Sequence, residues 1–488
     1  MQRIRQKLMR LWPAYLAQGR RTVKYPVIWI SLAVCSLSPG LISCSRSQSP
    51  SAPVAVAGSA PVATPKAKCG PGSRPEPGMQ GRLSQADIES GLAIKGITCN
   101  TELVGSYTTP NSYATVGGWK VERYVDSQGR ECAYYDASNI FPLGILDGAI
   151  GVNVMDMSDP THPVLTERLV TPAMLSPHES LILSKKRGLL MAVNSNPAVG
   201  PGVVDLYDLT KDCRHPVLKS ISLTATFGHE SGVSPDGRTF FSGSPVTSTI
   251  TAVDITNPEF PSTLWVAIMN THGLSISDDG NRAYVADSSG KMRILDISQI
   301  QARVPNPKVK TVSETEWEHR STPQNAVPFT TKGKPYVLEF DEFGAGKMVG
   351  AARIIDISNE KNPKVISDLR LEVHQPENFE ATANDPGAGD DFGGYSAHYC
   401  DIPTSIDPSI VACSMILSGL RIFDIRDPYH PREVAYFNAP LDGGALSSEP
   451  GKGGAVSRPA FAPERKEVWY TDSNSGFFAV RVTNGAWP

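Results

Sequence analysis

Five of the nine histidines occupy equivalent places along the chain, each at the start of a short predicted strand. They are His178, His229, His272, His319 and His398. Imidazole nitrogens are good ligands for copper, iron and zinc, so histidines gathered at one level of a fold can hold a transition metal. Three or four such ligands with one open coordination position would suit redox or hydrolytic catalysis. We therefore predict these five residues as metal ligands.

A long segment could bring carboxylates to the same site. Between His374 and Tyr395, more than twenty residues show no strand pattern, and they include Glu377, Glu380 and Asp391. Loops of this length in a compact domain are usually functional or disordered. We predict these three carboxylates as catalytic groups, for example as a general base. The alternative is a solvated acidic surface loop.

A repeated strand motif would position these residues. An alternating apolar run that ends in an acid recurs six times, followed by one degenerate copy. The copies are Val152–Asp156, Val204–Asp208, Ile250–Asp254, Met292–Asp296, Ala352–Asp356, Leu420–Asp424 and Phe477–Arg481. Their last residues are 42 to 68 positions apart, and further short strands flank each copy. Seven units of four strands predict an all-β fold, a seven-bladed β-propeller, whose innermost strands surround the axis.

The motif itself resembles a known family. Its form Leu/Ile-x-Ile/Val-x-Asp-Ile/Val-Ser is similar to the LVIVD repeat of exported bacterial propellers, over roughly residues 100 to 485. The resemblance implies the seven-bladed fold but no activity, because one fold hosts many functions. In the placement of its histidines alone, the chain also resembles propellers with an axial histidine-bound metal, such as carotenoid oxygenases and nitrous oxide reductases.

A structural role for the same histidines is the competing interpretation. WD-repeat propellers place a Gly-His at the start of a blade, where the imidazole binds a serine and a buried aspartate, and Gly228-His229 resembles that pattern. The second strands of the units end in residues that could be such partners: Asp136, Asn194, Asp287, Asp341 and Asp472. The direction of the imidazole rings separates the two interpretations.

The two ends of the repeat region predict how the ring closes. Thr101–Tyr107 is similar to the outermost strand of the other units, and the last unit, Arg458–Thr483, has only three strands. We expect the N-terminal strand to complete the seventh blade. Residues 84–93 predict a helix outside the ring, with a capping box that starts at Ser84.

Six cysteines remain after the two near the N-terminus are set aside, and an even number is typical of disulfides in an exported chain. Cys400 and Cys413 flank a predicted hairpin, where opposed Cβ atoms lie close enough for a bridge. For the other four we expect Cys69 with Cys99 and Cys132 with Cys213. Other pairings of these four remain open.

The N-terminal region predicts export. Residues 1–44 have the basic start and short apolar stretch of a signal peptide. They end in Leu41-Ile42-Ser43-Cys44, which resembles the lipobox of bacterial lipoproteins, so Cys44 is the expected lipid anchor. Residues 45–68 predict a flexible Ser/Pro/Ala-rich tether, residues 69–100 an N-terminal extension, and 101–488 the propeller. We expect a cell-envelope lipoprotein; a periplasmic or freely secreted protein is the alternative.

Composition and the absence of known motifs argue against several classes of function. The chain has 46 Lys and Arg against 49 Asp and Glu, a formal net charge of −3, so we expect no nucleic acid partner. It contains no P-loop, GxSxG, HExxH or dinucleotide-binding motif. No run of eighteen apolar residues occurs, which argues against several membrane spans and leaves the lipid anchor as the only expected membrane attachment.

Two functions follow from these patterns. In the first, the axial histidines bind copper, iron or zinc and act on a small molecule. In the second, the propeller is a non-enzymatic surface scaffold for a protein, glycan or wall polymer, and the histidines are structural. We expect a monomer in both cases, and the residues alone do not decide whether the protein is an enzyme.

Overall fold

The computed structural model describes residues 62–108, 117–137, 150–196, 202–318, 321–343, 349–389, 393–441, 454–473 and 475–488. The predicted signal peptide with Cys44, the predicted ligand His319 and the predicted catalytic residue Asp391 lie outside these ranges. Among the described helices, none has both the length and the apolar character needed to cross a membrane.

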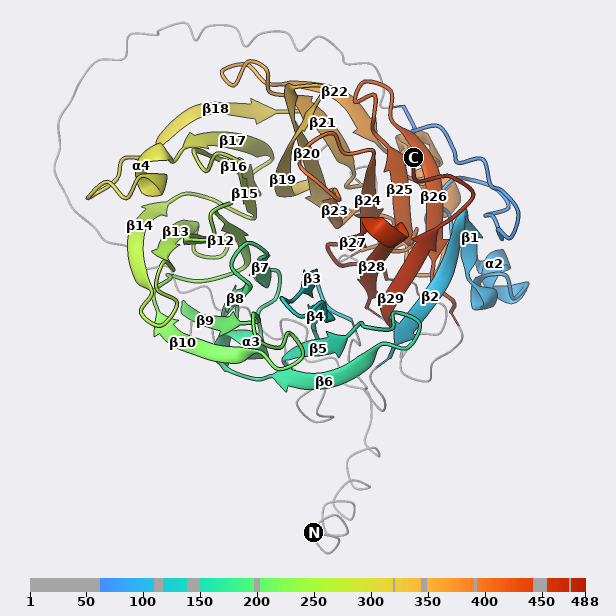
Figure 1. Cartoon of the computed structure of the whole chain (residues 1–488). Coiled ribbons are helices and arrows are strands. Elements are labelled where there is room, and N and C mark those ends of the chain that lie inside the picture. Colours follow the sequence, from blue (N-terminus) through green and yellow to red (C-terminus); the bar gives the residue numbers. More distant parts are fainter. Residues whose placement is uncertain are drawn as a thin grey trace, which may run out of the picture. The chain divides into compact units, whose positions relative to one another are not determined.

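Seven antiparallel sheets form a ring around one axis, which confirms the all-β seven-bladed β-propeller (Figure 1). Blades one to four contain β3 (Val121–Val125), β4 (Glu131–Asp136), β5 (Val152–Asp156) and β6 (Val164–Leu169); β7 (Ile182–Ser184), β8 (Leu189–Val193), β9 (Val203–Asp208) and β10 (Val217–Leu223); β11 (Glu230–Val233), β12 (Thr239–Ser244), β13 (Thr249–Asp254) and β14 (Ser262–Ile268); β15 (Leu274–Ile276), β16 (Arg282–Asp287), β17 (Lys291–Asp296) and β18 (Lys310–Glu316). Blades five to seven contain β19 (Thr322–Thr331), β20 (Lys334–Glu342), β21 (Ala352–Asp356) and β22 (Lys364–Leu369); β23 (Tyr399–Asp401), β24 (Ile410–Ser414), β25 (Leu420–Asp424) and β26 (Arg432–Asn438); β27 (Ala460–Ala462), β28 (Glu467–Asp472) and β29 (Gly476–Val482).

Short helical segments connect or flank the blades. The α-helices are α2 (Gln85–Glu89), α3 (Pro172–Leu175), α4 (Ser298–Gln301) and α5 (Phe379–Thr382). The 3₁₀ helices are η1 (Ala93–Lys95), η3 (Glu372–His374), η4 (Pro376–Asn378) and η5 (Pro463–Arg465). Ser84 caps α2 in a capping box with Asp87, as predicted, although the helix ends at Glu89.

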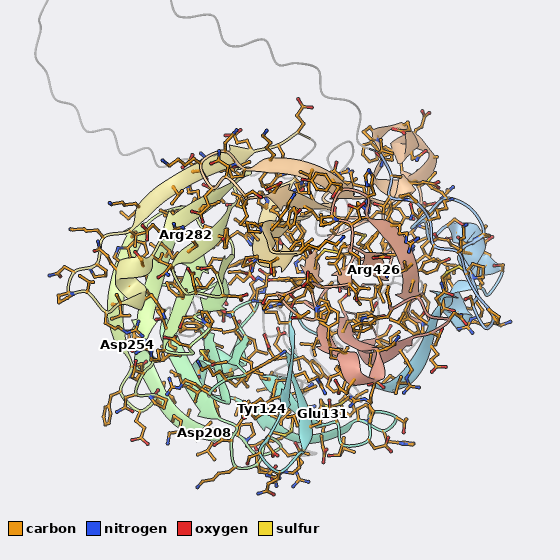
Figure 2. All side chains as sticks on the ribbon, turned by 45° about the horizontal axis from the view of Figure 1, so that its top comes forward. Tyr124, Glu131, Asp208, Asp254, Arg282 and Arg426 are labelled. Carbon is orange, nitrogen blue, oxygen red and sulfur yellow. A yellow bond between two sulfur atoms is a disulfide. The ribbon has the colours of Figure 1, made fainter. Side chains whose placement is uncertain are left out.

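The repeated motif forms the third strand of each blade. Its apolar residues are buried between neighbouring blades, as where Leu206 of β9 shares a core with Phe240 and Val253 of blade three. The acid that ends the motif closes a turn, because its side chain accepts a hydrogen bond from the backbone two residues later. Asp208 and Asp254, both labelled in Figure 2, do this with the backbone N–H of Thr210 and Thr256, each at 2.8 Å.

The N-terminal strand closes the ring. β2 (Thr101–Tyr107) pairs antiparallel with β29, so the seventh blade combines the two ends of the propeller, as predicted. β1 (Ile97–Cys99) adds a fifth strand to blade six by pairing with β26. Residues 62–68, which the sequence places in the flexible tether, contact the ring; Thr64 N–H, for example, donates to the carbonyl of Arg370 at 2.7 Å.

The structure contains the three expected disulfides, Cys69–Cys99, Cys132–Cys213 and Cys400–Cys413. The third joins directly opposed residues of β23 and β24. Cys132–Cys213 joins β4 of blade one to the turn that follows β9 of blade two. Three disulfides indicate an oxidising environment, which is found outside the cytosol.

We predict that removing Cys132–Cys213 lowers the free energy of unfolding more than removing Cys400–Cys413. The first bridge spans 81 residues and the second 13. Because a cross-link mainly restricts the unfolded chain, the chain-entropy relation gives about 4.5 kcal/mol for the longer loop and about 3 kcal/mol for the shorter. Urea unfolding of the two double serine variants measures both values, and a larger loss for Cys400–Cys413 would contradict the prediction.

Candidate metal centre

Four of the five predicted ligands lie at one end of the ring. His178, His229, His272 and His398 come just before the innermost strands of blades two, three, four and six. These strands run in the same direction around the axis, as parallel bridges between neighbouring blades show. The residues that open the strands therefore meet at one end of the axis. His319, the blade-five counterpart, is outside the described residues.

Three of the imidazole rings share two carboxylates. The Nε2 atoms of His229 and His272 lie 3.2 Å apart. Glu179 Oε2 lies 3.2 Å from His229 Nε2, and its Oε1 lies 3.1 Å from His398 Nε2. Glu342 Oε1 lies 2.8 Å from His272 Nε2, and its Oε2 lies 3.5 Å from His398 Nε2. Each carboxylate therefore contacts two of the three Nε2 atoms, and the contacts join the three rings in one cluster.

His178 lies at the edge of this group. Its ring centre is 4.5 Å from that of His229 and 5.1 Å from that of Trp119, and it meets both rings edge-on. The backbone at His178 has a φ of +49°, in the left-handed region that few non-glycine residues occupy. Burial lowers the pKa of His178 to about 3, so the ring is neutral near pH 7.

The other ring nitrogens of His272 and His398 face backbone carbonyls of the next blade. His272 Nδ1 lies 3.2 Å from the carbonyl oxygen of Gln324, and His398 Nδ1 contacts that of Val456. An Nδ1–H that donates to a carbonyl holds the ring in one orientation and leaves Nε2 free for another partner. Metal-ligating histidines commonly have this arrangement.

The acids that the sequence analysis offered as structural partners of the histidines bind other groups instead. Asp136 accepts a hydrogen bond from the backbone N–H of Trp119 at 2.7 Å, and Asp341 forms an ion pair with Arg353 at 2.6 Å. Asp287 pairs with Arg293. None of the hydrogen bonds described for these acids involves an axial histidine.

A buried ion pair lies beside the histidines. The Lys120 side chain is fully buried, with Nζ 3.0 Å from Glu230 Oε1. Asn325 donates a second hydrogen bond to the same oxygen. A Cβ on Gly273 would lie 1.8 Å from Glu230 Oε2. In blades two and three, a glutamate directly follows the histidine. In blade four this position is Gly273, because a side chain there would collide with the Glu230 carboxylate.

Negative charge exceeds positive charge among these side chains. The carboxylates are Glu179, Glu230 and Glu342, and the ammonium group is that of Lys120. When all three carboxylates are ionised, three negative charges against one positive charge leave two uncompensated. Uncompensated charge in a protein interior is costly. A divalent cation or two imidazolium ions would balance it.

The protonation of two histidines follows from the same charges. Burial disfavours the charged form of His272, but the Glu342 carboxylate outweighs it and raises the pKa of His272 to about 9. Burial also opposes protonation of His398, but the adjacent carboxylates of Glu179 and Glu342 raise its pKa to about 10. Without a metal, these two rings therefore carry the compensating charge near pH 7.

Several combinations of these side chains have the geometry of a ligand set. Within the described residues, three groups have ligand atoms that all lie within 4.8 Å of one another. The groups are His178, Glu179 and His229; Glu179, Glu230 and His272; and Glu179, Glu342 and His398. Glu179 belongs to all three. Imidazole nitrogens combined with carboxylate oxygens form a donor set that zinc, iron and copper accept.

The predicted catalytic acids lie elsewhere. Glu377 on η4 and Glu380 on α5 are exposed, and no described contact links them to the histidine cluster. His374, in the same segment, is buried; its Nδ1 accepts from the Leu371 N–H at 3.1 Å, and its Nε2 donates to the Tyr395 carbonyl at 2.7 Å. This histidine therefore orders the segment.

The sequence analysis missed the acids of the cluster, Glu179, Glu230 and Glu342, as well as Lys120. One pattern could have identified two of them, because His-Glu-Ser occurs at the same place in two consecutive blades, at residues 178–180 and 229–231. Glu342, at the end of β20, and Lys120, in blade one, have no comparable motif.

The comparisons with known proteins agree with the fold. Residues 145–171 and 271–300 match the LVIVD repeat, and the second match includes His272. No curated protein matches the sequence. Among solved structures, the periplasmic gluconolactonase of Pseudomonas aeruginosa is similar at 14% identity and a TM-score of 0.50, over 72% of this chain and 96% of that one. A chain of the mitotic checkpoint complex matches at 11% identity and a TM-score of 0.45, over 79% of this chain and 94% of that one. At such identities the likeness concerns the fold alone. This chain is a seven-bladed β-propeller that carries LVIVD repeats.

Proposed function

We propose that the histidine end of the ring binds one divalent transition-metal ion and uses it in chemistry on a small molecule. The observation that carries this proposal is the 3.2 Å separation of His229 Nε2 and His272 Nε2. Two imidazoles on one zinc ion, each with a bond of about 2.0–2.1 Å, have their nitrogens at nearly this separation in tetrahedral geometry.

The ligands would be His229, His272 and His398, with a carboxylate oxygen from Glu179 or Glu342. The ion would also supply the positive charge that the three buried glutamates require. His229 is the most exposed of the four histidines, with 16% of its side chain accessible against 3% for His272 and 1% for His398. A small molecule would therefore reach the ion on the side of His229.

A bound copper, iron or zinc ion would act as a Lewis acid or redox centre at this position. The chain's own residues would hold it: carbonyls of neighbouring blades orient His272 and His398, and the carboxylates of Glu179 and Glu342 supply negative charge beside them. The disulfides support an oxidising environment for this chemistry, and the predicted lipobox at Cys44 supports the cell envelope as its location. If the end of the ring binds no metal, a surface scaffold is the remaining function.

We predict that the purified protein binds about one equivalent of zinc, copper or iron and that the His229→Ala/His272→Ala variant does not. A ligand that binds only the folded state stabilises it by about 2.7 kcal/mol at a hundred times its Kd, so adding the metal should raise the Tm of the wild type alone. Elemental analysis and thermal unfolding, with and without chelator, measure both effects.

The matched control removes two exposed histidines of the outer turns. His162 and His430 pair with Asp159 and Asp427 on the surface, at 3.1 and 2.9 Å. The His162→Ala/His430→Ala variant should bind metal like the wild type. A folded wild type that takes up none of the three metals, with an unchanged Tm in their presence, would rule the metal centre out and leave the scaffold.

We also predict that Glu179→Gln weakens metal binding by about ten- to a hundredfold. Glu179 contacts two of the proposed ligands, and an amide would replace one carboxylate oxygen with a donor that repels the ion. Competition with a metal-indicator dye gives the affinity, and Glu314→Gln, at an exposed ion pair with Lys291, is the control. Equal affinities for wild type and Glu179→Gln would show that Glu179 has no part in binding.

A further inference from the structure

A cavity opens at the other end of the axis. It has a volume of about 300 Å³, and the innermost strands of all seven blades line it. Each strand contributes residues that follow those of the histidine end: after His229 come Ser231 to Val233, and after His272 come Leu274 to Ile276. The cavity and the histidine cluster are therefore separate places along one axis.

One buried carboxylate in the cavity lacks a hydrogen bond. Glu122 of β3 is only 8% exposed and lines the cavity, and its Oε1 has no hydrogen-bond partner among the described residues. The nearest described cation is Arg458, whose Nη1 lies 3.9 Å away. A buried acceptor left without a donor costs free energy. A bound molecule that donates to Glu122 would remove this cost.

The other charged side chains of the cavity wall include both acids and bases. Arg458 donates through Nε to Asp401 Oδ2 at 2.7 Å, and its described side-chain hydrogen bonds use no other nitrogen. Lys185, near the rim, makes no hydrogen bond or ion pair with any described residue. The lining thus contains three acids, Glu122, Asp278 and Asp401, and three bases, Arg123, Lys185 and Arg458. This balance favours a ligand without net charge.

A hydroxyl group meets these requirements, because it donates to a carboxylate and accepts from a guanidinium group at the same time. The wall also has serine and threonine hydroxyls, such as those of Ser231, Ser275 and Thr404, beside apolar side chains that include Ile182, Ile276 and Phe461. Such surfaces can cover the C–H faces of a ring. The volume lies at the lower end of the range for ligand pockets, so the ligand is small.

We infer that this cavity binds a neutral polyhydroxylated molecule of monosaccharide size, with Glu122 and Arg458 as its polar contacts. The site is distinct from the proposed metal centre and does not depend on it. The two can therefore be tested separately, with the cavity assayed both in chelator and after metal addition.

The test is a binding panel with the purified wild-type chain. Neutral probes are the methyl glycosides of glucose, mannose and galactose, and myo-inositol; agmatine and gluconate are the cationic and anionic probes. Saturation-transfer NMR and calorimetry should show binding of at least one neutral probe, equal with and without metal. Glu122→Gln should weaken that binding about tenfold, as loss of a hydrogen bond to a charged group predicts.

A second variant tests the cavity itself without changing its charge. Ile276→Trp fills the space and should abolish binding, while Glu89→Gln, at an exposed position on α2, should bind like the wild type. Thermal unfolding confirms that each variant is folded. Failure of every neutral probe to bind, tighter binding of a charged probe, or unchanged binding in folded Glu122→Gln and Ile276→Trp would each overturn the inference.

Discussion

The common direction of the seven innermost strands is the constraint on which the rest of the structure depends. Because these strands run parallel around the axis, every residue that opens one is carried to the same end, and every residue that closes one to the other. A property that recurs once per repeat therefore becomes a ring of side chains in space. Histidine at the first position makes an imidazole cluster, and the later positions make a cavity.

The two ends of the axis differ in their balance of charged side chains. Near the histidines, the carboxylates outnumber the single ammonium of Lys120, and the excess negative charge has to be met by protons or by a cation. In the cavity, acids and bases are equal in number, and one carboxylate oxygen lacks a donor. The histidine cluster and the cavity lie only a few residues apart on the same strands. Their different charge balance makes them two chemically different candidate ligand sites.

The sequence predicted the parts of this arrangement that repeat. The apolar motif defined seven blades, and in six of them its terminal acid closes the same turn. The missing fourth strand of the last unit predicted that Thr101–Tyr107 would fill it. The convergence of His229 and His272 followed from their equivalent positions. Glu342 could not be predicted, because it depends on how far β20 extends. Glu377 and Glu380 were expected near the axis, but they are exposed on η4 and α5, short helical turns that no strand pattern indicates.

The pairing of β2 with β29 has a consequence for how the protein is made. The strand that closes the ring, β2, is synthesised before strands β3 to β26 of blades one to six, and its partner at residues 476–482 is synthesised after them. Until then, β2 presents an unpaired edge, the kind of edge that invites association with other chains. Contacts between such distant parts of a chain also form slowly. The seventh blade can therefore form only after nearly all of the ring has been synthesised.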